Sequence, residues 1–144
     1  PGLYLAPFTN DLVVIMNTFN KISEKVTVND VPLNKWLNVI LRVENTTLDV
    51  YVNGTIVKRH KLSGVPKQNY GDVFVSMNGG FNGYTSNLWY WDYALGTTHI
   101  QKIIDDGPDM TMKGTDMKQS EPRYFSTRWF FNNVDSTGGG YGGI

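Results

Sequence analysis

Residues Trp36 to Val57 read "WLNVILRVENTTLDVYVNGTIV", and apolar and polar side chains alternate through most of this stretch. Successive side chains of a strand point to opposite faces, so a strand over 36–44 has one apolar face. That face holds Leu37, Val39, Leu41 and Val43. The next strand repeats the pattern with Leu48, Val50 and Val52. Asn53-Gly54 then provides two residues that tolerate positive φ, as a two-residue type I′ hairpin requires.

The same turn predicts the register of the hairpin. If the loop is two residues long, counting outward from it sets Val50 opposite Val57 and Asp49 opposite Lys58. The first pair is apolar and the second pairs opposite charges, so both pairs favour this register.

Further strand candidates flank this hairpin, and turn residues separate most of them. They cover Leu3 to Ala6, Leu12 to Asn17, Lys25 to Val28, Asp72 to Asn78 and Ser86 to Tyr93. About seven or eight short antiparallel strands predict an all-β jelly-roll sandwich.

One short helix is predicted in "TTHIQKIIDDGP", where Ile100, Ile103 and Ile104 form an apolar stripe and Gly107-Pro108 ends the helix. The remainder contains "RYFSTRWFF" and ends in the Gly-rich "STGGGYGGI", which is typical of a flexible tail or an extended arm. We therefore expect a domain over 1–108 and a C-terminal extension over 109–144.

Composition narrows the classes of function. The 144 residues carry no net charge, which argues against a nucleic-acid partner, and no apolar run is long enough to span a membrane. The chain has no cysteine, so disulfides and cysteine-ligated zinc are excluded. A chain that begins at Pro1 without a leader is expected to be a fragment or a processed product.

The order of these segments resembles a known family. The stretch from Pro32 to Val57, a Gly-Val-Pro loop, and "FNGYTSNLWYWDYALGTTHIQKIIDDGP" at 81–108 resemble the second half of a laminin-G-like domain of the concanavalin A-like lectin/glucanase superfamily. The resemblance implies a non-catalytic recognition module that binds carbohydrate or a glycosylated or protein surface, outside the cell or on a virion. Gly96 and His99 replace the Ser and Glu of the family's helix start, so a capping box is not expected.

The superfamily includes glucanases, whose paired carboxylates on one strand act as nucleophile and general acid. The chain has three glutamates, Glu24, Glu44 and Glu121, and none is followed two residues later by Asp. The two histidines, His60 and His99, show no spacing typical of a Ser-His-Asp arrangement. We therefore expect no enzyme, and a glycoside hydrolase is the least favoured alternative.

Calcium is the one cofactor that the sequence leaves open. Asp105, Asp106 and Asp109 cluster after the predicted helix, and carboxylates are typical calcium ligands. A solvated acidic loop explains the same residues and is the favoured interpretation, so no cofactor is predicted.

The aromatic stretch "FNGYTSNLWYWDYALG" at 81–96 holds the candidate ligand site. On a strand over 86–93, Asn87, Trp89, Trp91 and Tyr93 share one face. The resemblance implies that Leu88 and Tyr90 face the core, that Trp91 packs under the helix, and that position 89 is exposed. An exposed indole predicts a stacking platform for a sugar, or a surface that the C-terminal extension or a partner covers. The candidate ligand residues are Tyr84, Asn87, Trp89, Tyr70 and Asn82.

Two functions follow. The first is a lectin-like binder that uses these residues. The second is a structural protein, for example a minor component of a large DNA virus capsid, whose C-terminal arm contacts neighbouring capsid proteins. Similar domains with a comparable "NLWYWDYALG" stretch occur in such viruses.

Overall fold

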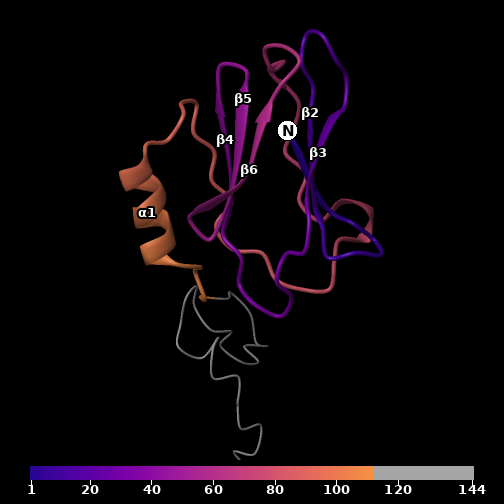
Figure 1. Ribbon diagram of the computed structural model, residues 1–144. Coiled ribbons are helices and arrows are strands. Elements are labelled where there is room, and N and C mark those ends of the chain that lie inside the picture. The colour runs from indigo at the N-terminus through magenta and orange to yellow at the C-terminus, as the bar shows by residue number, and fades with distance from the viewer. Residues whose placement is uncertain (112–144) are drawn as a thin grey trace, which may run out of the picture.

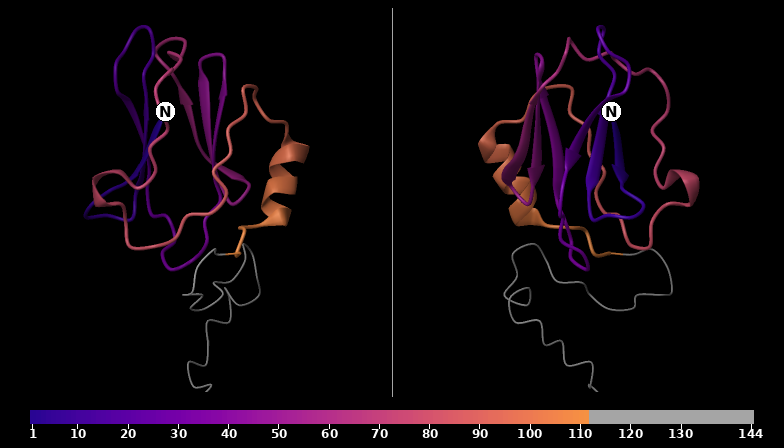
Figure 2. Two further views of the ribbon diagram at one scale, coloured as in Figure 1. Left: turned by 180° about the vertical axis from the view of Figure 1, so that it is seen from behind. Right: turned by 45° about the vertical axis from the view of Figure 1, so that its right-hand side comes forward.

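Two antiparallel three-stranded sheets make up the β structure of the computed structural model, which describes residues 1–111 (Figure 1). The first sheet contains β1 (Gly2–Leu5), β2 (Leu12–Met16) and β3 (Glu24–Val28), paired in that order. The second contains β4 (Val39–Glu44), β5 (Thr47–Val52) and β6 (Thr55–Lys61). The views in Figure 2 agree that the second sheet lies between the first sheet and the helix.

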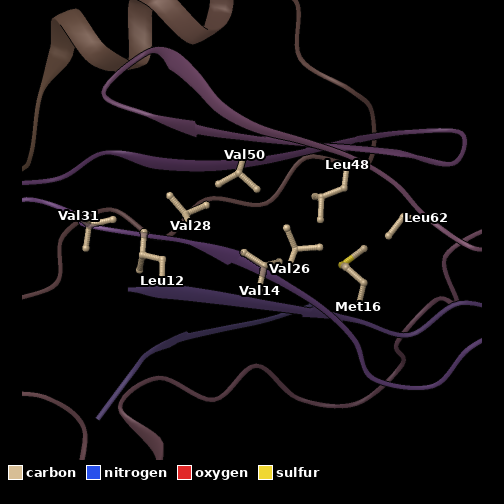
Figure 3. Packing of buried hydrophobic residues seen from close by; sticks show 9 residues of the cluster. All are labelled: Leu12, Val14, Met16, Val26, Val28, Val31, Leu48, Val50 and Leu62. Atoms are coloured by element: carbon tan, nitrogen blue, oxygen red, sulfur yellow. The ribbon is translucent and has the colours of Figure 1, made fainter. Parts of the chain in front are cut away.

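The hydrophobic core lies between the two sheets, as Figure 3 shows. Val14 of the first sheet and Leu48 and Val50 of the second are fully buried. Leu48 and Val50 come from alternating positions of β5, so the period-two pattern correctly predicted the face of this strand that packs on the first sheet. Asp49 and Tyr51 on its other face are buried as well. The cluster consists of Leu12, Val14, Met16, Val26, Val28, Val31, Leu48, Val50 and Leu62.

Two predicted strands, at 72–78 and 86–93, are wrong. The structure has a short 3-10 helix, η1 (Met77–Gly79), at the end of the first segment and no strand in the second. Ser76 and Asn87 take positive φ values of 58° and 52°, which interrupt the extended backbone that a ladder requires. The other predicted strands are confirmed to within a few residues, whereas the jelly-roll order of strands stays a prediction.

The predicted register of the hairpin holds only beside the turn. Val52 pairs with Thr55 and Tyr51 with Ile56, but Val50 then pairs with Lys58. Val57 is thus an extra residue in β6, a β-bulge that shifts every later pair by one position. Asp49 therefore faces Arg59 rather than Lys58, which corrects the predicted pairing.

Helix α1 (Thr97–Asp106) is confirmed, and its N-cap residue is Gly96, which makes no side-chain cap hydrogen bond. Its C-cap residue is Gly107, whose φ of 68° suits glycine. The apolar stripe of the helix packs on the second sheet through a cluster of Tyr51, Leu95, Ile100 and Ile104, joined by Ile40, Trp91 and Ile103. Figure 1 shows α1 beside this sheet, on the side away from β2 and β3.

The hairpin turn also contacts the helix. A Cβ atom at Gly54, where φ is +82°, would lie 2.5 Å from Ile104 Cδ1. Glycine at this position therefore serves the turn and the docking of α1 together.

No helix within residues 1–111 is long and apolar enough to cross a membrane. The predicted C-terminal extension over 109–144 lies almost entirely outside the described residues, as does Glu121.

Candidate functional site

Trp89 and Trp91 form a stacked pair just before α1. Their ring centroids are 6.0 Å apart and their planes differ by 21°. Trp91 is half-buried and packs against the cluster beneath α1, as the resemblance implied. Trp89 is 64% exposed, so an anchored indole supports a second indole that faces solvent.

The prediction that Leu88 and Tyr90 face the core is wrong, because these side chains are 73% and 84% exposed. The left-handed Asn87 precedes them, and the segment has no neighbouring strand to pair with. Without a ladder, an alternating pattern does not fix which side chains face the sheet. The predicted shared face of Trp89 and Trp91 is nevertheless seen in their stacking.

The other candidate ligand residues are exposed and are not gathered into one pocket. Asn82, Tyr84 and Asn87 lie on the same exposed segment as Trp89, and in the described part of the chain no hydrogen bond or ring contact links them to it. Tyr70 lies in a different setting, at a shallow hollow.

This hollow has a volume of about 490 Å³ and is lined by Phe19, Pro66, Lys67, Gln68 and Tyr70. Lys67 Nζ lies 5.7 Å from the centre of the Phe19 ring, within the range of a cation–π contact. The Tyr70 hydroxyl donates a 3.3 Å hydrogen bond to Gln68 Oε1. Sequence reasoning identified Tyr70 but missed Phe19 and Lys67, because a contact between distant segments brings them together.

A buried polar cluster joins the two sheets at Glu24, which is 5% exposed. Its carboxylate accepts a 2.7 Å hydrogen bond from Ser63 Oγ and lies 2.9 Å from His60 Nε2. These hydrogen bonds, that with His60 first, lower the pKa of Glu24 from 4.5 to about 2. Ser63 thus contacts the carboxylate, and no hydrogen bond within residues 1–111 joins it to the imidazole of His60.

Glu44 is also engaged, since Arg42 Nη2 lies 2.6 Å from Glu44 Oε2. Arg42 Nε donates a 2.9 Å hydrogen bond to the carbonyl oxygen of Leu95 and so connects β4 to the loop before α1. This arginine therefore has a structural role beneath the helix.

Within residues 1–111, no group of three or more His, Asp or Glu side chains could hold a metal ion. Asp105 accepts a 2.9 Å hydrogen bond from Gln101 Nε2. Asp109 accepts hydrogen bonds from the backbone and hydroxyl of Thr111, and these lower its pKa. The preference for a solvated acidic loop over a calcium site stays a prediction.

A comparison with curated proteins found no match. Among solved structures, the chain is similar to residues 221–444 of an S-layer domain-containing protein from Clostridium thermocellum ATCC 27405, with 16% sequence identity and a TM-score of 0.37. The match covers 64% of this chain and 49% of that one, so this chain spans about half the length of the S-layer domain-containing fragment.

A family model gives the more informative match. The laminin-G model described as the concanavalin A-like lectin/glucanases superfamily matches residues 6–101. This range is well over half of the chain and includes β2 to β6 and the stacked tryptophans, whereas β1 precedes it. The chain therefore belongs to the concanavalin A-like lectin/glucanases superfamily, within its laminin-G branch.

Proposed function

We propose that the chain is a non-catalytic recognition module that binds carbohydrate, with Trp89 as its stacking platform. The observation that carries this proposal is the stack itself, in which the half-buried Trp91 supports an indole that is 64% exposed. A free indole surface of this kind matches the C–H face of a sugar ring, whose polar hydroxyls remain available at its rim.

The anchoring of Trp91 matters for affinity. Because Trp91 packs against the cluster under α1, the stacked Trp89 loses less conformational freedom when a ligand binds. Asn87 and Tyr84 lie within a few residues of Trp89 and are exposed, so their amide and hydroxyl groups are candidates to orient the sugar, together with Asn82.

The state of the described glutamates supports binding rather than hydrolysis. A retaining or inverting glycosidase needs two carboxyl groups that flank the scissile bond. Glu24 is buried against His60 and Ser63, and Glu44 pairs with Arg42. We place the protein outside the cell or at a particle surface, where a carbohydrate-binding module meets its ligands.

A glycan array probed with the full chain, Trp89→Ala and Tyr90→Ala tests this function. Tyr90 is an equally aromatic and more exposed neighbour that lacks the stack, so it is the matched control. We expect selective binding by the parent and by Tyr90→Ala, and loss of signal for Trp89→Ala with an unchanged melting temperature. A parent chain that gives no glycan signal, or an alanine variant at 89 that retains it, would contradict the proposal.

A second candidate function is assembly, and the exposed apolar side chains before the stack favour it. Val73, Phe74 and Val75 are 77%, 69% and 55% exposed, which is unusual for a monomer in water. In this alternative the same fold builds a surface layer or a capsid, and the C-terminal extension contacts neighbouring subunits. Light scattering at increasing protein concentration tests this alternative, and a concentration-dependent oligomer would support it. Protease digestion of the C-terminal extension, alone and with its partners, is the second test. A protein that stays monomeric, with an extension that is cleaved equally in both states, would contradict assembly.

A further inference from the structure

The hollow at Phe19, Lys67 and Tyr70 has a chemistry different from that of the tryptophan stack. Its lining offers two exposed aromatic rings, a proline, an amide and an ammonium group, and it includes no carboxylate. Phe19 and Tyr70 are 70% and 88% exposed, although aromatic rings are usually among the more buried side chains. A cation beside uncovered aromatic faces is a combination that matches a ligand with a negative group and a flat apolar face.

The floor of the hollow is fixed by backbone pairing between two distant segments. Thr18 and Pro66 form an isolated antiparallel bridge, and Thr18 is fully buried. Phe19 N donates to Val65 O at 3.0 Å, and Lys67 N donates to Asn17 O at 2.8 Å. The two residues that supply the ring and the charge are therefore held at defined positions on each side of the bridge.

The same pairing determines what kind of ligand fits. The backbone N–H groups of Phe19 and Lys67 are already used, and Pro66 has none to offer. An extended peptide recognised by strand addition needs free backbone donors, and these three positions do not provide them. Recognition here has to use ring faces, the ammonium of Lys67 and the amide of Gln68.

The side chains that remain are suitably arranged for such recognition. Lys67 Nζ lies 5.7 Å from the Phe19 ring centre, and none of the ion pairs within residues 1–111 includes it. Gln68 Oε1 accepts from the Tyr70 hydroxyl, so the NH₂ group of this amide is left to donate to a ligand. A volume of about 490 Å³ is in the range of small-molecule sites.

We propose that this hollow is a second binding site that recognises a negatively charged pyranose sugar, in which Lys67 pairs with the carboxylate or sulfate and Phe19 and Tyr70 contact the C–H faces of the ring. The site uses none of the residues of the Trp89 stack, so it can be tested independently of the function proposed above.

NMR titration of the full chain with three related sugars tests the site. Methyl β-glucuronide carries its negative charge on a carboxylate and glucose 6-sulfate carries it on a sulfate. Methyl β-glucoside is the neutral control. We expect shifts of the amides around 17–20 and 65–70 with a charged sugar, and binding of the neutral sugar about two- to fivefold weaker, as for one partly exposed ion pair. The preferred charged sugar identifies the anionic group.

Variants then assign the contacts. Lys67→Gln is expected to abolish the preference for the charged sugar, and Lys67→Arg to retain it. Lys102→Gln removes one exposed positive charge from α1 and is expected to change nothing. Phe19→Leu is expected to weaken all three sugars together, because the ring contact does not depend on charge.

Three results would overturn the proposal: equal binding of charged and neutral sugars, equal effects of Lys67→Gln and Lys102→Gln, or equal binding of N-acetylglutamate amide, which would indicate an acidic peptide. Trp89→Ala is expected to leave this titration unchanged, so failure of the stack and failure of the hollow give different results.

Discussion

Arg59 and Asp49 form a two-point ion pair across the β5–β6 hairpin. Arg59 Nε lies 2.6 Å from Asp49 Oδ1, and Arg59 Nη2 donates a 3.0 Å hydrogen bond to Asp49 Oδ2. Asp49 is 1% exposed, and Arg42 Nη1 approaches the same carboxylate at 3.5 Å. The hydrogen bond from Arg59 lowers the pKa of Asp49 even though burial opposes this shift.

Replacing Asp49 is expected to destabilise the domain. Asp49→Asn leaves the guanidinium groups of Arg42 and Arg59 without their carboxylate, and a loss of about 1–3 kcal/mol in the free energy of unfolding is expected for such a buried group. Urea denaturation measures this loss. Arg59→Ala is expected to lower the midpoint and Lys58→Ala to leave it nearly unchanged, because the bulge at Val57 pairs Asp49 with Arg59. A larger effect at Lys58 would mean that the unbulged register is the real one.

Acid is expected to weaken the contact between the two sheets through Glu24. Its pKa is lowered to about 2 in the folded chain, so its ionised form stabilises the fold above its ordinary pKa of 4.5. That contribution is lost as the pH falls from about 4.5 through about 2. Urea midpoints measured across this range are expected to fall.

Glu24→Gln serves as the comparison, because the amide cannot titrate. Its midpoint is expected to be lower at neutral pH and to depend less on pH than that of the parent. Parallel curves for parent and variant would show that Glu24 does not carry the acid sensitivity.

The contact of the hairpin turn with α1 predicts a specific intolerance of alanine at Gly54. Gly54→Ala places a side chain at a φ of +82° and 2.5 Å from Ile104 Cδ1, so a loss of about 1–3 kcal/mol is expected. Gly107→Ala is the control for the backbone cost, since φ there is also positive, at 68°, but a Cβ meets no atom within 4 Å. Thermal denaturation compares the two.

Ile104→Val removes the contacting Cδ1 atom and costs about 0.5–1.5 kcal/mol by itself. If the turn and helix contact each other as described, Gly54→Ala combined with Ile104→Val destabilises less than the sum of the two changes. If the effects of the two changes are strictly additive, the destabilisation by Gly54→Ala comes from the backbone of the turn alone and not from contact with Ile104.

The sequence predicted what depends on local pattern. Alternation identified the face of the central strands that packs on the first sheet, Asn53-Gly54 identified the turn, and the isoleucine stripe with Gly107 identified the helix. The bulge at Val57 was not predictable from turn length, because it serves a pairing of Asp49 with Arg59 that alternation does not encode.

The candidate site was predicted only in part, because local sequence pattern does not encode contacts between distant segments. The resemblance to the family implied the exposure of Trp89 and the anchoring of Trp91, and the spacing placed both on one face. The prediction for Leu88 and Tyr90 is wrong because Asn87 takes a left-handed conformation and ends the extended backbone. A single asparagine in the sequence does not predict a left-handed conformation, because asparagine also adopts extended ones. The hollow depends on the bridge between Thr18 and Pro66, which joins segments far apart in sequence.

Carbohydrate recognition by the stacked pair is the central claim, and calorimetric titration of the best array ligand into matched variants tests it most directly. Trp89→Ala is expected to weaken binding by about five- to a hundredfold, as for loss of one stacking indole, while Tyr90→Ala binds like the parent and all three chains melt alike. Equal affinities for parent and Trp89→Ala, or a loss of affinity shared by Tyr90→Ala, would contradict the account.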